Sequence, residues 1–427
     1  MASTTPCPGA GAPEFHLRDG ALWCEDVALA PLAARYGTPL YVYSAAAVRG
    51  RVRRVREAFG AAAEVCFAVK SNSNLHVLRL LHGEGCGFDL VSGGELERLR
   101  VARLPTARAV FAGVAKQPWE IEAAAAAGIL FFNVESPHEL PALAAAGEAA
   151  GQRVRVALRL NPDVDPDTHA YISTGKDENK FGVALARAGG VVSAIQADPW
   201  LELVGYHVHL GSQLQSARPY QEALQKVLAF VDEDDRRGRG VRYYDLGGGF
   251  GISYGEGAPL DVRSVADAVL PELQRRGWTP VVEPGRYLVG DAGLLLTSVL
   301  GTKSQGRSRF VLVDAAMNDL MRPALYQAEH PIVPVCARPE RAEQVVDVVG
   351  PVCETGDFLG RRRSLPVLDE GDLLAVLAAG AYGASMASNY NSRPKPAEVL
   401  VDGEQATLVR RRETFARMFA DETEASG

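Results

Sequence analysis

Lys70 stands where an amine could do chemistry. It ends an apolar run, Val65 to Val69, and the polar residues Ser71 to Asn74 follow it. Such a run, bounded by polar turn residues, is typical of a buried strand. Partial burial lowers the pKa of a lysine, so its amine becomes a nucleophile that can form a Schiff base. A lysine that simply keeps its ammonium in water is the plainer interpretation, so Lys70 needs support from other residues.

A carboxylate and a guanidinium follow another apolar run. Glu283 comes after residues 279–282 and is succeeded by Pro284, Gly285 and Arg286. A carboxylate beside a pyridine nitrogen keeps that nitrogen protonated, and the protonated ring is a strong electron sink. Arg286 offers a forked donor for a phosphate or a carboxylate. An ordinary ion pair at a turn is the alternative.

A glycine-rich loop, Gly247 to Gly249, follows the run that ends at Asp245. Consecutive glycines let backbone N–H groups surround an anion such as a phosphate. Ser212 could donate to the same phosphate, and His209 could stack on a planar ring. A flexible turn also explains the loop, and neither dinucleotide nor P-loop spacing is present, so no nucleotide is indicated.

Together these residues supply an amine, a phosphate cradle, a ring partner and a carboxylate for a pyridine nitrogen. Pyridoxal 5′-phosphate requires all four. The sequence therefore predicts this cofactor, and no cysteine or histidine spacing indicates a metal.

The elements that must position these residues alternate between strand and helix. Strand-like runs are expected near 64–69, 86–91, 109–112, 129–134, 154–160, 202–208, 241–246 and 279–283. Helical segments are expected at 45–59, 94–101, 119–127, 137–150 and 218–237. Eight such units in about 250 residues predict an α/β fold of the (β/α)8 TIM-barrel type, with a doubly wound open sheet as the competitor. In a barrel the polar residues at the strand ends, which also include Asp89, Arg159, Asn161 and His207, share one rim.

After residue 288 the pattern changes. Short apolar runs near 294–300, 309–313, 344–349, 372–377 and 397–401 are separated by polar, glycine or proline turns. We therefore expect residues 38–288 to form the barrel and residues 289–427 a mostly antiparallel, β-barrel-like domain. Residues 1–37 are expected to join that second domain.

Composition excludes several classes of protein. The 427 residues carry a formal net charge of −7 and are 47% hydrophobic, which indicates a globular protein and argues against nucleic-acid or anionic-membrane partners. The six cysteines form no CxxC pair, and Cys66 and Cys86 fall in apolar runs typical of a core. Neither a signal peptide nor a membrane-spanning run is evident, so a cytoplasmic location is expected.

At these residues the chain resembles a known family, the barrel-type pyridoxal-phosphate decarboxylases, and most closely the diaminopimelate decarboxylases. The segments that carry the resemblance are 67–72, 207–213, 245–250, 283–286, 314–323, 350–357 and 381–394, in family order. Residues Tyr171–Gly175 and Asn179–Gly182 favour the diaminopimelate branch over ornithine and arginine decarboxylases.

The resemblance implies a role for each matched residue. Lys70 would form the Schiff base, His209 would stack on the ring and Glu283 would pair with the pyridine nitrogen. Cys353 would protonate the carbanion after CO2 is lost. The phosphate would be held by Ser212, Gly247, Gly248, Gly249, Gly285, Arg286 and Tyr382, and the substrate by Arg286, Arg322, Tyr326, Glu354 and Tyr382. Because Cys353 and Glu354 act in the other subunit's site in this family, a homodimer with shared active sites is implied.

The activity implied is decarboxylation of meso-2,6-diaminopimelate to L-lysine and CO2, the last step of lysine biosynthesis. A far-end carboxylate on the substrate suits the arginines of the expected site. A sister decarboxylase acting on another amino acid in a specialised pathway is the alternative. An amino-acid racemase is disfavoured by Glu283, and a cofactor-holding protein without activity is disfavoured by the presence of the Cys353 segment.

Overall fold

The computed structural model describes residues 4–165, 180–255 and 257–424. The chain divides into two compact units. The first comprises Arg51–Gly251 and Pro259–Tyr287, and the second comprises Met1–Gly50, Ile252–Ala258 and Leu288–Gly427.

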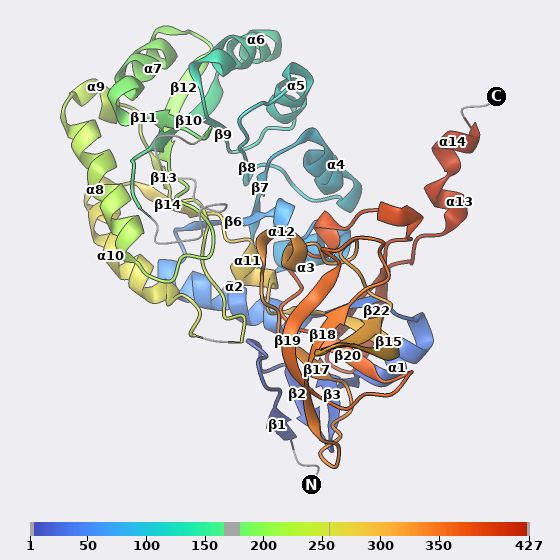
Figure 1. Cartoon of the computed structure of the whole chain (residues 1–427). Coiled ribbons are helices and arrows are strands. Elements are labelled where there is room, and N and C mark those ends of the chain that lie inside the picture. The colour runs from blue at the N-terminus through green and yellow to red at the C-terminus, as the bar shows by residue number, and fades with distance from the viewer. Residues whose placement is uncertain (1–3, 166–179, 256, 425–427) are drawn as a thin grey trace. The chain divides into compact units, whose positions relative to one another are not determined.

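The first unit is built on a closed barrel of eight parallel strands (Figure 1). They are β6 (Glu64–Ala68), β7 (Gly87–Leu90), β8 (Ala109–Phe111), β9 (Phe131–Val134), β10 (Val154–Asn161), β12 (Leu201–His207), β13 (Tyr243–Asp245) and β14 (Thr279–Val282). Each strand pairs with its neighbours in parallel, and the pairs β9–β10 and β14–β6 close the ring. A two-residue strand, β11 (Val183–Ala184), extends β10 at the edge. The predicted (β/α)8 barrel is confirmed.

Helices alternate with the strands and cover the outside of the barrel. They are α3 (Leu75–Gly83), α4 (Gly93–Ala102), α5 (Pro118–Ala126), α6 (Leu140–Ala150), α7 (Leu185–Ala197), α8 (Arg218–Asp232), α9 (Asp235–Gly238) and α10 (Val262–Arg276), with α2 (Ala45–Phe59) before β6. Side-chain caps fix several starts, as where Asn74 accepts from His76 N and Ser92 from Glu95 N. The 3₁₀ turns are η1 (Val69–Ser71) and η2 (Pro137–Glu139).

One helix prediction is wrong. The segment 218–237, expected as one helix, forms α8 and α9 with a break at Asp234. The backbone of Asp234 is extended, and its carboxylate accepts from Arg236 N, so it starts a new helix instead of continuing the old one.

The second unit contains a larger sheet with strand order β19-β18-β16-β15-β5-β21-β22. Its strands are β5 (Leu40–Ser44), β15 (Gly293–Gln305), β16 (Ser308–Val313), β18 (Glu343–Val349), β19 (Phe358–Pro366), β21 (Ala397–Asp402) and β22 (Gln405–Arg410). The strands β17 (Ile332–Pro334) and β20 (Leu373–Val376) attach through β15. Only the pairs β16–β18 and β5–β21 are parallel among these described strands, so the sheet is mostly antiparallel as expected.

The N-terminal residues form a small antiparallel sheet of their own in the same unit. Its strands are β1 (Thr4–Pro6), β2 (Phe15–Arg18), β3 (Ala21–Cys24) and β4 (Val27–Ala28), followed by α1 (Leu29–Tyr36). The strand that joins the larger sheet is β5, which pairs with β15 and β21. The boundaries expected at residues 38 and 288 stay predictions.

Candidate active site at the barrel rim

The carboxyl ends of the barrel strands carry the polar residues that the sequence singled out. Lys70 lies in η1 directly after β6, Asp89 lies in β7, and His207 and Asp245 end β12 and β13. Glu283 follows β14. Parallel strands in a barrel end on one face, so these side chains meet at one rim.

Lys70 and Asp89 form an ion pair at this rim. The Lys70 Nζ atom lies 2.6 Å from Asp89 Oδ2, and Asp89 is completely buried while the lysine side chain is 36% exposed. Burial and the nearby charge of Glu283 raise the pKa of Asp89 to about 7, against the opposing effect of Lys70. A buried acid therefore holds the amine nitrogen in place, while part of the lysine side chain stays exposed and can be reached by a carbonyl group.

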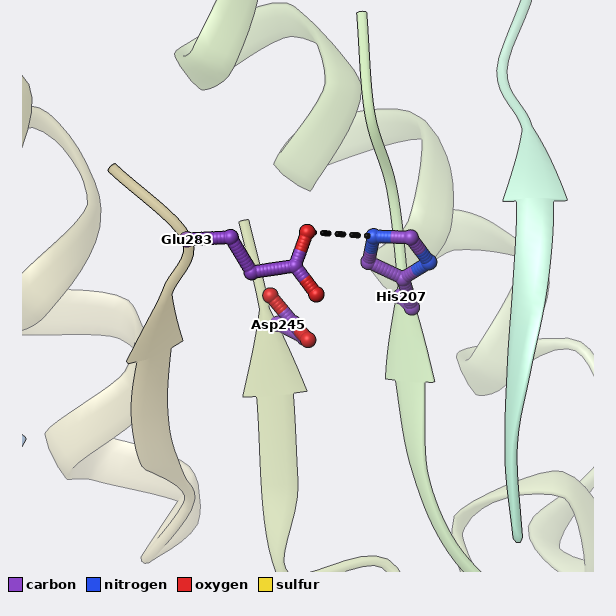
Figure 2. A group of neighbouring side chains, drawn as sticks. All are labelled: His207, Asp245 and Glu283. Carbon is purple, nitrogen blue, oxygen red and sulfur yellow. Dashed lines mark ion pairs between the residues drawn. The ribbon is translucent and has the colours of Figure 1, made fainter. Parts of the chain in front are cut away.

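Glu283 lies in a buried polar cluster at the ends of β12, β13 and β14. Figure 2 shows the carboxyl groups of Glu283 and Asp245 directed toward each other and toward the ring of His207. One oxygen or nitrogen atom from each of the three residues lies within 4.8 Å of the other two, and Glu283 Oε2 is 3.5 Å from His207 Nε2. Asn133 Nδ2 donates to Glu283 Oε1 at 3.2 Å.

The neighbours of Glu283 set its charge. Burial acts to raise its pKa, but His207, the charge of Lys70 and a hydrogen bond from Asp245 hold the pKa well below its usual range. Burial lowers the pKa of His207, so its imidazole is neutral at physiological pH. Glu283 is thus the ionised group of the cluster, as a partner for a protonated pyridine nitrogen has to be.

The glycine loop packs against His209 and Glu283. Gly248 N donates to His209 Nδ1 at 3.2 Å, and burial lowers the pKa of His209 well below its usual value, so the ring is neutral. A Cβ on Gly248 would lie 2.2 Å from Glu283 O, and one on Gly249, whose φ is +90°, would lie 2.4 Å from Gly211 O. Only glycine fits these positions.

Arg286 and Ser212 form the donor pair expected for a phosphate. Arg286 is 9% exposed, and its Nη2 atom donates to Ser212 Oγ at 2.9 Å. Gly285 lets this turn pack closely against the residues around Lys70, because a Cβ there would lie 3.0 Å from both Ala68 Cβ and Ser71 Oγ. An amine, an ionised carboxylate, a forked donor, a hydroxyl and a glycine loop at one rim fit pyridoxal 5′-phosphate.

Asn133 and Glu135 are rim residues that the sequence did not reveal. Asn133 is fully buried at the end of Phe131–Val134 and contacts Glu283. Glu135 accepts from Arg159 Nη1 at 2.6 Å in a buried pair, so Arg159 is held at the rim as predicted. The signal for Asn133 was a single amide in an apolar run, which many strands contain.

In the second unit, the loop that follows β18 carries Cys353 and Glu354. Both residues are exposed. The buried carboxylate of Asp357 accepts from Met317 N and from Val352 N, each at 2.7 Å, and so joins this loop to the segment 314–323. Cys353 N donates to Asn391 Oδ1 at 2.9 Å. Three of the family segments are therefore tied together by polar contacts to the backbone.

The other expected substrate residues lie in the same unit. Arg322 begins α12 (Arg322–Tyr326) and is 5% exposed, and its Nη1 atom is 2.9 Å from His330 Nε2. His330 Nδ1 is 2.9 Å from Leu377 O, which can only accept, so Nδ1 carries the proton and Nε2 accepts from Arg322. The guanidinium also lies over the ring of Tyr254, 4.8 Å from its centroid.

Tyr326 ends α12 and Tyr382 has a φ of +56°, and both are half-buried. The structure thus brings Lys70, His209, Ser212, Glu283 and Arg286 together in the barrel, and holds the Cys353 and Arg322 segments within the second unit. The segment Tyr171–Gly175 and Asn179, which favoured the diaminopimelate branch, lie outside the described residues. No helix among the described residues is long and apolar enough to cross a membrane.

Comparison with known protein families shows the class of protein to which this chain belongs. The family model described as "Pyridoxal-dependent decarboxylase, pyridoxal binding domain" matches residues 45–290. Those residues contain the whole barrel and its rim.

Individual relatives narrow the class. A diaminopimelate decarboxylase of Pseudomonas fluorescens is 49% identical over 411 residues, which are 96% of this chain and 98% of the relative. The crystal structure of the Helicobacter pylori diaminopimelate decarboxylase complexed with L-lysine matches with a TM-score of 0.89 at 39% identity, over 93% of this chain and 100% of that one. The M. jannaschii enzyme, also in complex with L-lysine, gives 0.91 at 37% identity, over 96% and 98%. The chain belongs to the pyridoxal-dependent decarboxylases and, within them, to the diaminopimelate decarboxylase family.

Proposed function

We propose that this protein removes the carboxylate from one end of meso-2,6-diaminopimelate, with pyridoxal 5′-phosphate as cofactor, and releases L-lysine and CO2. The observation that carries the proposal is the rim itself. The strand ends of the barrel carry a partly exposed lysine amine, an ionised Glu283 and the Ser212–Arg286 donor pair. The relatives that match this chain over nearly its full length are diaminopimelate decarboxylases. Two of the similar structures contain L-lysine, the product of this reaction.

When bound, the cofactor supplies an aldehyde that condenses with amines and a ring that accepts the electron pair left by the departing CO2. The protein contributes the rest. Lys70 would hold the aldehyde carbon through its amine. Glu283 would keep a proton on the pyridine nitrogen, and neutral His209 would face the ring without adding a charge. Ser212, the glycine loop, Gly285, Arg286 and Tyr382 would bind the phosphate.

The second unit would serve the substrate. We propose that Arg322, with Tyr326 and Tyr382, binds the carboxylate at the far end, which a simple diamino acid lacks, and that Glu354 binds the far ammonium group. Arg286 would contribute at the phosphate end. Cys353 Sγ would supply the proton that replaces CO2.

We further propose a homodimer in the cytoplasm. Cys353 and Glu354 are exposed and their loop is fixed by Asp357, which suits residues that complete the site of a second copy. Mixing a Lys70→Ala chain with a Cys353→Ala chain tests this idea. Hybrid dimers with one intact site should recover part of the activity that both parents lack, whereas sites made by a single chain would recover nothing. Cell fractionation tests the location.

Product analysis tests the activity. Purified protein loaded with pyridoxal 5′-phosphate is incubated with meso-diaminopimelate, and the lysine and CO2 formed are measured. We expect one CO2 for each lysine. Parallel reactions with L-lysine, L-ornithine and L-arginine serve as the specificity control. Turnover of one of these, with none of diaminopimelate, would identify a sister decarboxylase. Loss of chirality without CO2 would identify a racemase.

A further inference from the structure

Two buried acids have their carboxyl groups close together at the rim. The carboxyl groups of Asp245 and Glu283 are hydrogen-bonded to each other, and their side chains are directed toward one another in Figure 2. Asp245 is completely buried and Glu283 is 4% exposed. Two ionised carboxylates have no hydrogen to donate and repel each other, so one of the two has to be protonated.

The contacts of Glu283 favour its ionised form. Asn133 Nδ2 donates to Oε1 at 3.2 Å, and His207 Nε2 lies 3.5 Å from Oε2. Both oxygens therefore face a group that can donate. The ammonium of Lys70 also acts on Glu283. An acceptor surrounded by donors and a cation is the stable place for a negative charge.

The contacts of Asp245 favour its neutral form. Its Oδ1 accepts from Gly247 N at 2.9 Å, and the amide donor that reaches Oδ2, Asn133 Nδ2, does so at a long 3.5 Å. Lys70 is bound to Asp89 instead, at 2.6 Å. The titratable groups that act on Asp245 or lie beside it are Glu283, Asp89, His207, Cys66 and Tyr244, and none of them is a cation at neutral pH. Burial and the charges of Glu283 and Asp89 raise the pKa of Asp245 well above its usual range.

We propose that Asp245 is a neutral carboxylic acid whose proton, donated to Glu283, keeps Glu283 as the single ionised carboxylate of the pair. Asp245 is thus a positioning residue that acts through Glu283. The inference deepens the proposed function, because it rests on Glu283 pairing with the pyridine nitrogen. A second ionised carboxylate beside Glu283 would repel it and would leave its orientation unfixed.

Substitution of Asp245 by asparagine distinguishes a neutral Asp245 from an ionised one. Asp245→Asn keeps the size of the side chain, keeps an oxygen for Gly247 N and keeps an N–H that can donate to Glu283. It therefore imitates the protonated acid and removes its titration. Asp245→Ala removes the donor and the acceptor together, and Glu283→Gln removes the negative charge that Asp245 is proposed to support.

The apoprotein gives a readout that needs neither cofactor nor substrate. A group whose folded pKa is raised binds more protons when folded, so its contribution to stability is lost as pH rises above the unfolded pKa of about 3.9. The melting temperature of Asp245→Asn minus that of the wild type should therefore increase between pH 5 and pH 8. The difference infrared spectrum, wild type minus Asp245→Asn, should contain the carbonyl stretch of a neutral carboxylic acid. A pH-independent difference and no such band would overturn the proposal.

Cofactor titration gives the second readout. Asp245→Asn should bind pyridoxal 5′-phosphate within about tenfold of the wild type and give the same absorption spectrum, whereas Asp245→Ala and Glu283→Gln should bind more weakly by about tenfold or more. Equal losses in Asp245→Asn and Glu283→Gln would show that an ionised Asp245 is needed, and would refute the inference. If no lysine forms from diaminopimelate while the apoprotein results hold, only the proposed function fails.

Discussion

The barrel rim and the loops of the second unit hold reactive groups in opposite ways. At the rim, Asp89, Asp245 and Glu283 are buried, and each carboxylate contacts a cation, a donor or another acid. In the second unit, Cys353 and Glu354 are exposed, and contacts of backbone N–H groups with Asp357 and Asn391 hold their loop. The rim therefore sets the charge of its groups, whereas the contacts of the loop set the position of Cys353 and leave it exposed.

If the rim carries the reactive groups, substitution of Lys70 should have the largest effect on activity. Lys70→Ala removes the amine that we propose binds the cofactor, so kcat should fall on the order of 10³-fold or more. Treatment of the loaded wild type with borohydride, followed by digestion and mass spectrometry, should find the cofactor on the peptide that contains Lys70. Lys303→Ala, at an exposed position of β15, is the matched control and should keep full activity. Adduct formation at another lysine would contradict the assignment.

Asp357 tests whether the loop works through position alone. Asp357→Ala leaves Met317 N and Val352 N without their acceptor, which costs about 1–3 kcal/mol for each buried donor. A displaced Cys353 should lower kcat by about 10²-fold while cofactor binding at the rim stays unchanged. Stopped-flow absorbance and cofactor titration separate the two quantities.

The control for this loop is Asp347→Ala. Asp347 accepts from a single backbone donor, Arg362 N, at 2.7 Å in the same sheet. Its loss should change stability slightly and kcat very little. If Asp357→Ala weakens cofactor binding as much as it lowers kcat, then a displaced loop is not the cause of the lower kcat.

The two regions also differ in how far the sequence could reveal them. Most barrel strands are apolar runs with a polar residue at or just after the carboxyl end, so the barrel could be predicted, with Lys70 and Glu283 at its rim. Asn133 could not, because its partner Glu283 lies 150 residues away. In the second unit β19 was missed, since Arg361, Arg362 and Arg363 hide its apolar alternation. The function of Asp357 as an acceptor for Val352 N and for Met317 N, which lies 40 residues away, has no recognisable sequence pattern.

His330 sharpens the comparison on the substrate side. His330→Leu removes the acceptor that holds the Arg322 guanidinium, so KM for diaminopimelate should rise about tenfold with a smaller change in kcat. His330→Gln, which can still accept, should restore part of the affinity. The exposed His76→Gln is the control. A fall in kcat with KM unchanged would show that Arg322 does not act in substrate binding.

Substitution of Asp319 should give the smallest effect on activity. It tests how burial alone changes the pKa of an acid that has no proposed part in the reaction. This acid of the second unit is almost completely buried, and its carboxylate accepts from Ala316 N at 2.9 Å and from Asn318 Nδ2 at 3.0 Å. Burial raises its pKa to about 7, as it does for Asp89, against the opposing charges of Arg393 and Arg412. The folded state thus binds more protons than the unfolded state between pH 4 and 7.

The sign of the pH dependence follows from that difference. Stability should fall as pH rises from about 4 to about 7, by up to about 1.4 kcal/mol per pH unit, and then level off, because the unfolded carboxyl group is already ionised in this range. Asp319→Asn removes this titration. Urea unfolding at pH 5 and pH 8 should therefore show the variant gaining stability relative to the wild type at the higher pH, with kcat changed less than by the Lys70, Asp357 and His330 variants. An advantage at pH 5 that disappears at pH 8 would mean that Asp319 is ionised in the folded protein, and that burial alone does not set the charge of an acid outside the rim.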